Sequence, residues 1–183
     1  MRRALALIPL LLVLPACNEK PATVAVQVQN SKTPGDKSYR SEEGRFSVHF
    51  PKDPSVSNKE LATPSGVLKV QTAKADAGRD SVYSVTHVTY PPSFGEVDPV
   101  KILDGVRDGL KGQDGELKSD KSSTTGEDAL PTRDIRIDAG KNGIRARLIL
   151  VDRRLVQAMV VGAKDSLDAK PAEEFFKSLE VTK

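Results

Sequence analysis

The sequence predicts an α+β domain with a mostly antiparallel β-sheet, and three of its features support this fold class. Residues 45–50 alternate apolar and polar side chains, which is typical of a half-buried strand. An Asn-Gly pair at 142–143 separates two further strand-like segments, as in a β-hairpin. Amphipathic helix patterns begin near Asp98 and near Asp168, so helices interrupt and then close the series of strands.

The first sixteen residues have the three parts of a bacterial export signal. Two arginines follow the initial methionine, residues 4–14 are almost entirely apolar, and the small residue Ala16 ends the segment. The apolar run is about eleven residues long, whereas a membrane-spanning helix needs roughly 20. We therefore expect residues 1–16 to be a signal peptide that is removed on export.

Residues 14–17, Leu-Pro-Ala-Cys, resemble the lipobox of bacterial lipoproteins. In that family the cysteine thiol receives a diacylglyceryl group, the signal is cut just before the cysteine, and the new N-terminus is acylated in many species. The resemblance implies an exported protein that is anchored through lipid at Cys17 in the bacterial cell envelope. Pro15 departs from the small or aliphatic residue that is usual at its position. Asn18 stands where aspartate signals inner-membrane retention in enterobacteria, which favours the outer membrane in a cell that has one.

Cys17 is the only cysteine of the chain, so no intramolecular disulfide can form. The alternative to lipidation is an ordinary secretory signal that leaves Cys17 as a free thiol. A lone exposed thiol is a liability in an oxidising compartment, and a thioether linkage to lipid removes it.

The composition after signal removal argues against a nucleic-acid partner. Without Arg2 and Arg3, the 28 basic residues become 26 against 25 acidic residues, a net charge of +1. The chain has no Trp and only five Phe and three Tyr. A nearly neutral surface with few aromatic rings offers neither electrostatic attraction nor stacking platforms for nucleic acid.

The remaining chain divides into a tether and one domain. Residues 17–43 are mostly polar, so we expect the lipidated cysteine to be followed by a flexible tether. A short apolar run at 24–28 could form a strand but has no clear neighbour. Residues 44–183 number about 140, enough for a single domain with a real core.

The first half of this domain predicts three strands. Residues 45–50 form the first, which Pro51 ends. Residues 67–73 form the second, and residues 81–90 form the third, which the prolines at 91–92 end.

The first helix begins at Asp98 and Pro99, because aspartate is a good N-cap and proline suits the first helical position. Gly105 and Gly109 lie beside its apolar stripe. Each costs about 1 kcal/mol relative to alanine in a helix, which predicts close packing at both. The stripe consists of Ile102, Leu103, Val106 and Leu110.

Four strands and a helix complete the domain. Residues 116–124 are rich in charged and hydroxyl side chains, which is typical of a protected sheet edge. Residues 133–138 and 144–151 form the hairpin, and residues 155–161 form the last strand. In these last strands both the odd-numbered and the even-numbered residues are largely apolar, which predicts central strands covered on both faces. The closing helix has an apolar stripe of Ala172, Phe175, Phe176 and Leu179.

Two stretches resemble PsbP-like domains of the Mog1/PsbP/DcrB-like superfamily, which includes bacterial lipoproteins. They are GRFSVHFPKDP at 44–54 and IRARLILVDRRLVQAMVVGA at 144–163, the latter followed by the closing helix. The resemblance covers about residues 44–181. It implies an antiparallel sheet sandwiched between helices, and binding or accessory roles rather than catalysis. It carries no functional residues.

No catalytic residues and no metal site are predicted. The sequence lacks the G-x-S-x-G, S-x-x-K and H-E-x-x-H motifs. His49 lies on the polar face of its predicted strand, so we expect it at the surface or at a rim. His87 is expected to be a packing residue. A metal site would need both histidines on adjacent strands with a carboxylate nearby.

Arginines gather around the hairpin and suggest a surface for a partner. If the apolar residues of 144–151 face one layer, Arg145 and Arg147 share the opposite face. One interpretation is cross-strand ion pairing with nearby aspartates. The other is a partly basic patch for an acidic partner or anionic headgroups. The predicted partner-binding patch consists of Arg136, Arg145, Arg147 and Arg153.

The expected function is a non-enzymatic binding or accessory role of a lipid-anchored cell-envelope protein, without a cofactor. Its partners would be the membrane, through Cys17, and an unknown envelope protein. One alternative is an envelope hydrolase, which requires His49 or His87 in a concave site with a carboxylate within hydrogen-bond reach. Another is a small-ligand carrier with a pocket between sheet and helices.

Overall fold

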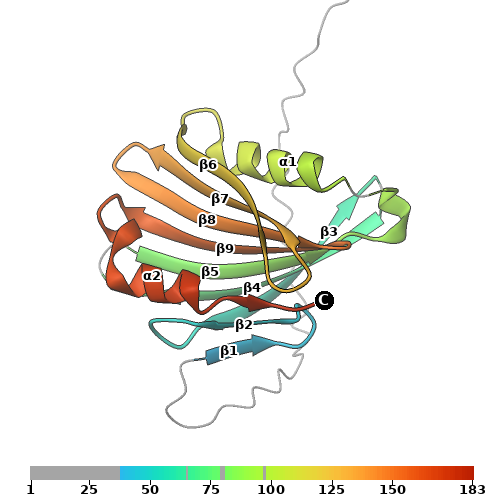
Figure 1. The fold of residues 1–183 in the computed structure, drawn as a ribbon, viewed down its shortest axis with the longest axis horizontal. Helices are drawn as coiled ribbons and strands as arrows, with labels where there is room; N and C mark the ends of the chain where they lie inside the picture. Colours follow the sequence, from blue (N-terminus) through green and yellow to red (C-terminus); the bar gives the residue numbers. More distant parts are fainter. Residues whose placement is uncertain (1–37, 65, 79–80, 97) are drawn as a thin grey trace, which may run out of the picture. The chain divides into compact units, whose positions relative to one another are not determined.

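Seven strands, each antiparallel to its neighbours, form the main sheet in this computed structural model (Figure 1), which describes residues 38–64, 66–78, 81–96 and 98–183. The predicted signal peptide, Cys17 and most of the predicted tether lie outside these residues. The α+β class with a mostly antiparallel sheet and two α-helices is confirmed for the described part. In spatial order the strands are β3 (Ser55–Thr63), β4 (Gly66–Asp76), β5 (Ser81–Thr89), β9 (Arg154–Ala163), β8 (Asn142–Val151), β7 (Leu130–Ala139) and β6 (Glu116–Thr125).

The two edges of this sheet are polar. β6 is the edge strand predicted from residues 116–124, and its register with β7 shifts between Leu117 and Ser119. β3, at the other edge, was not predicted. Most of its residues are exposed, so it lacks the apolar alternation of a half-buried strand. It is held instead by pairing with β4 along its whole length, from Ser55 opposite Lys74 to Thr63 opposite Gly66.

The central strands supply two separate hydrophobic clusters. Even-numbered residues of β9, such as Val156, enter a cluster with α2 (Lys170–Lys177). Leu155 of β9 and even-numbered residues of β8, such as Leu148, enter a cluster with α1 (Pro99–Lys111). This division explains why both the odd-numbered and the even-numbered residues of these strands are apolar.

The helix α1 begins where the sequence predicts. Asp98 Oδ1 accepts a hydrogen bond from the backbone nitrogen of Val100 at 2.9 Å, and Pro99 is the first helical residue. The predicted close packing at Gly105 and Gly109 is wrong, because a Cβ at either position would have no atom within 4 Å. The two glycines face open space.

A small sheet packs beside the larger one, and it begins inside the predicted tether. Its strands, in spatial order, are β1 (Ser38–Ser41), β2 (Phe46–His49) and β10 (Glu180–Val181). Ser38, where the described chain begins, lies opposite His49 in the register of β1 with β2. Tyr39 is buried, and its ring centroid lies 5.9 Å from that of Phe46 and 6.1 Å from that of Phe50. The folded part therefore starts at least six residues before the predicted boundary at 44.

The closing helix is preceded by a short 3-10 helix, η2 (Ser166–Asp168), where the sequence predicts the helix itself to start. Leu167 of this turn is fully buried. Ala172, Phe175 and Phe176 of α2 are buried as the stripe predicts. Neither α-helix of the described chain is long and apolar enough to span a membrane.

Candidate functional site

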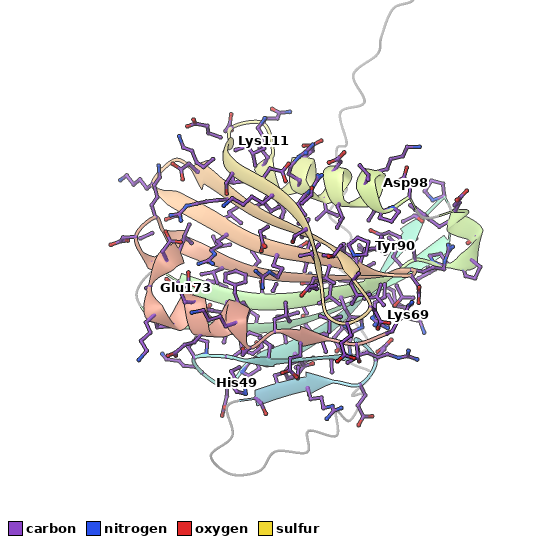
Figure 2. The ribbon with its side chains drawn as sticks, in the orientation of Figure 1. His49, Lys69, Tyr90, Asp98, Lys111 and Glu173 are labelled. Atoms are coloured by element: carbon purple, nitrogen blue, oxygen red, sulfur yellow. The ribbon has the colours of Figure 1, made fainter. Side chains whose placement is uncertain are left out.

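An open groove of about 460 Å³ lies between the end of β2 and one face of α2. His49 marks the β2 side of this region in Figure 2. The residues that line the groove are His49, Phe50, Pro51, Pro171, Glu174, Lys177 and Ser178.

Proline and packing make the walls of the groove rigid. Pro51 follows β2 and Pro171 lies in the first turn of α2, and each ring fixes the backbone φ angle. Phe50 is 1% exposed, and its ring centroid lies 5.2 Å from that of Phe175. The groove therefore has a packed aromatic residue beneath it and two stiff rims.

Ser178 joins the two walls. Its Oγ accepts a hydrogen bond from the backbone nitrogen of His49 at 2.8 Å. The same hydroxyl donates to the carbonyl oxygen of Phe175 at 2.9 Å. Both bonds hold the end of α2 against β2, and they leave no general base placed to activate the hydroxyl as a nucleophile.

The charged and polar side chains of the groove differ in whether they have an ion-pair or hydrogen-bond partner. Glu174 Oε1 lies 3.7 Å from the Nζ of Lys170, one turn earlier on α2. Lys177 and the imidazole of His49 are exposed, and neither makes a hydrogen bond or an ion pair with any side chain of the described ranges. The groove thus presents two potential donors from two different elements.

Three of the predicted arginines lie together on the face of the hairpin that contacts η2 and α2. Arg145 Nη1 donates to Glu173 Oε1 at 2.5 Å, and the guanidinium carbon lies 4.7 Å from the centre of the Phe176 ring. This hydrogen bond from Arg145, more than any other contact, lowers the pKa of Glu173. Arg147 and Arg136 lie on the same side of the hairpin.

The other two arginines of this group also donate hydrogen bonds to carboxylate and carbonyl oxygens within the domain. Arg147 Nε donates to Asp134 Oδ1 at 2.7 Å, across the strand pair β7 and β8. Arg136 donates to Asp168 and, at 3.0 Å, to the carbonyl oxygen of Lys164. The cross-strand ion pairing that the sequence suggests is therefore present, and additional partners come from the segment that leads into α2.

Arg153 lies elsewhere, under the loop that follows β5. Its guanidinium donates to the carbonyl oxygens of Tyr90 at 3.1 Å and Gly95 at 2.7 Å, and also to that of Pro91. The structure thus brings together Arg136, Arg145 and Arg147 but not Arg153. That these four residues bind a partner stays a prediction.

A second ion-pair network ties α1 to the sheet. Arg107 Nη1 contacts Asp104 Oδ1 at 3.0 Å and Asp120 Oδ2 of β6 at 2.9 Å. Arg133 of β7 is buried and also contacts Asp104. These charges compensate one another and belong to the scaffold.

His87 is a buried packing residue, as its strand position predicts. It is 2% exposed, and its ring centroid lies 6.1 Å from that of Phe46. A Cβ at Gly44 would lie only 2.8 Å from its Nδ1, which has no hydrogen-bond partner in the described chain. Burial lowers the pKa of His87.

The hydrolase alternative finds part of its requirement in the groove. His49 shares the groove with Glu174 and Ser178, but no hydrogen bond joins its imidazole to a carboxylate among the residues the structure describes. The same residues contain no cluster of three or more His, Cys, Asp or Glu side chains placed to hold a metal ion.

Comparison with known proteins shows the fold alone. No family model matches the sequence, and no curated protein matches it. Fifteen chains among solved structures match. One is the solution structure of cyanobacterial PsbP (CyanoP) from Synechocystis sp. PCC 6803, with a TM-score of 0.51 and 16% sequence identity. The match covers 79% of this chain and 91% of that chain, so the described domain has a PsbP-like fold.

Proposed function

We propose that this chain is a lipid-anchored protein of the bacterial cell envelope whose domain binds a partner without catalysing a reaction. The observation that carries the proposal is the groove between β2 and α2. It offers two exposed side chains, His49 and Lys177, that form no hydrogen bond or ion pair with another side chain of the described residues, beside an apolar surface. The one hydroxyl group among its lining side chains, that of Ser178, is engaged in structural hydrogen bonds.

The anchor is proposed from the sequence of residues 14–17. Cleavage before Cys17 would leave residues 18–37 between the lipid and the start of β1. Twenty residues reach at most about 70 Å when fully extended. A tether of that length keeps the domain near the membrane and raises its effective concentration for partners there. The absence of aspartate at position 18 favours the outer membrane.

The proposal includes the finer fold of PsbP-like domains, a sheet enclosed by helices on both sides. Its support is the alternation of neighbouring residues between clusters: Leu155 packs with α1, whereas Val156 packs with α2. Successive residues of a strand point to opposite faces of a sheet.

Crosslinking in the native cell, followed by purification of the full-length lipidated protein, tests the binding role. We expect one envelope protein to be recovered in near-stoichiometric amounts. A Cys17→Ser form is the control, because it keeps the groove and loses the anchor. Recovery of no specific protein with either form would contradict the proposal.

The mass of the mature N-terminus tests the anchor itself. We expect a chain that begins at Cys17 and carries acyl groups. An unmodified cysteine, or cleavage at another position, would refute lipidation while leaving the fold unaffected.

The second candidate is an envelope hydrolase, which is favoured by His49, Glu174 and Ser178 lining one groove. It predicts that His49→Ala removes hydrolysis of simple ester or amide substrates by the purified domain. Equal activity of the wild type and this variant would exclude the groove as a hydrolytic site.

A further inference from the structure

The helical wall of the groove follows one face of α2. Pro171, Glu174 and Lys177 are three residues apart, so they lie in a row on that face. At 1.5 Å per residue, the row with Ser178 extends over about 10 Å. An extended peptide of three or four residues has this length.

Charge is unbalanced at one end of this row. The other lysines of α2 and of the segment before it have acidic partners: Lys170 contacts Glu174, and Lys164 contacts Asp138. Lys177 forms no such ion pair in the described chain, although, after Arg145, its charge helps to lower the pKa of Glu173 on the same helix. The His49 imidazole lies on the opposite wall. A ligand that brings a carboxylate to this end would give Lys177 a direct, charge-assisted hydrogen bond.

The opposite end of the groove is apolar. Pro171 and Pro51 form its rims, and Phe50 lies beneath them. Proline-rich segments, whose polyproline II helix is preformed, lose little conformational entropy when they dock into an apolar groove.

We infer that the groove holds an extended peptide segment of the partner, with an acidic side chain placed against Lys177 and His49. The inference rests on the proposed partner-binding function and names the chemistry of the partner. A lipid surface fits less well. Attraction to anionic headgroups takes a cluster of about four to eight basic residues, whereas Lys177 is accompanied by Glu174.

Titration followed by amide NMR tests the inference on the mature chain carrying Cys17→Ser. The probe is the capped peptide Ac-Ala-Pro-Glu-Pro-Ala-NH₂, with counterparts that carry Gln or Lys in place of Glu. We expect the Glu peptide to shift the amide signals of His49, Lys177 and Ser178. Its affinity should exceed that of the Gln peptide by about threefold to tenfold, the range of one charge-assisted contact in an open site.

Charge variants make the test specific. Lys177→Gln should abolish the preference for the Glu peptide, and Lys177→Glu should transfer the preference to the Lys peptide. Lys141→Gln is the matched control, because it removes the same charge at the exposed turn between β7 and β8. Equal binding of all three peptides to the wild type, or no shift of groove signals, would overturn the inference. So would binding of phosphatidylglycerol vesicles that depends on Lys177 and is stronger than peptide binding.

The cellular crosslinking experiment separates this inference from the proposed function. If the wild type recovers a partner and Lys177→Glu recovers much less, the groove is the contact surface. If both recover equal amounts, the groove inference fails and the binding role stands. If the wild type recovers no partner, the binding role itself fails.

Discussion

At the scale of single residues, His87 couples the fold to pH. Burial lowers its pKa below the ordinary value of 6.5, Arg154 lowers it further, and Glu43 opposes both. The unfolded chain therefore takes up a proton at a pH at which the folded chain does not. Stability is full above the unfolded pKa and is lost as the pH falls toward the folded pKa.

His87→Gln should flatten this dependence. We expect the urea midpoint of the wild type to fall between about pH 6.5 and pH 5 and that of the variant to change less over the same range. His49→Gln is the control, because that imidazole is exposed. Parallel curves for the wild type and His87→Gln would show that His87 does not carry the effect.

Arg145 decides between the two interpretations of the arginine cluster. Its side chain is 25% exposed and contacts Glu173, the carbonyl oxygen of Leu167 and the Phe176 ring. Arg145→Met should lower the free energy of unfolding by about 1–2 kcal/mol, since it removes charge-assisted bonds that are partly screened by solvent. Urea denaturation measures this.

Partner recovery by Arg145→Met completes the comparison. Where the variant remains folded, we expect it to retain the crosslinked partner, because its guanidinium is engaged within the domain. Normal stability combined with loss of the partner would instead support the predicted basic patch.

At the scale of elements, the two interior glycines of α1 lower the free energy of unfolding without a packing role. A Cβ at Gly105 or Gly109 would meet no neighbouring atom. Gly105→Ala and Gly109→Ala should each raise the free energy of unfolding by about 0.5–1 kcal/mol. Gly112→Ala is the contrasting variant, because φ is 60° at that position and an L side chain is strained there. Urea midpoints that fall for Gly105→Ala or Gly109→Ala would reveal packing that the structure lacks.

β1 belongs to the domain rather than to the tether, and substitutions of two of its adjacent residues test this. Tyr39 is 9% exposed and donates to Gln71 Oε1 at 3.3 Å, whereas Arg40 is exposed. Tyr39→Ala should cost about 3–4 kcal/mol, as for other buried aromatic residues. Arg40→Ala should change the urea midpoint little. Small and equal changes of the urea midpoint in both variants would show that this segment is part of the tether.

At the scale of the whole molecule, the sequence predicts most of the elements and misses the strands β1 and β3. The hairpin and the closing helix follow from patterns that burial imposes on local sequence. β3 was missed because both its faces are largely exposed. β1 was missed because Tyr39 is its only apolar residue and its other buried residue is a serine.

The groove was beyond sequence prediction for a different reason. Pro51 and Pro171 signal rigid points in the chain, but nothing local shows that they face each other. The contact that forms the site joins His49 to Ser178, which are 129 residues apart. The arginines illustrate the same limit. The sequence pattern placed Arg145 and Arg147 on one face, but it could not show that the acidic partners of Arg145, Asp168 and Glu173, come from the C-terminal segment.

The register of β1 with β2 has a mechanical consequence. In the proposed lipid-anchored protein, a pull from the membrane would enter the domain at Ser38, which lies directly opposite His49 at the wall of the groove. A force between the anchor and a bound partner would cross a single pair of strands and bypass the seven-stranded sheet. Loaded from its open end, that pair would separate one bond at a time. The tether junction would then yield first under tension, while the rest of the domain stays folded.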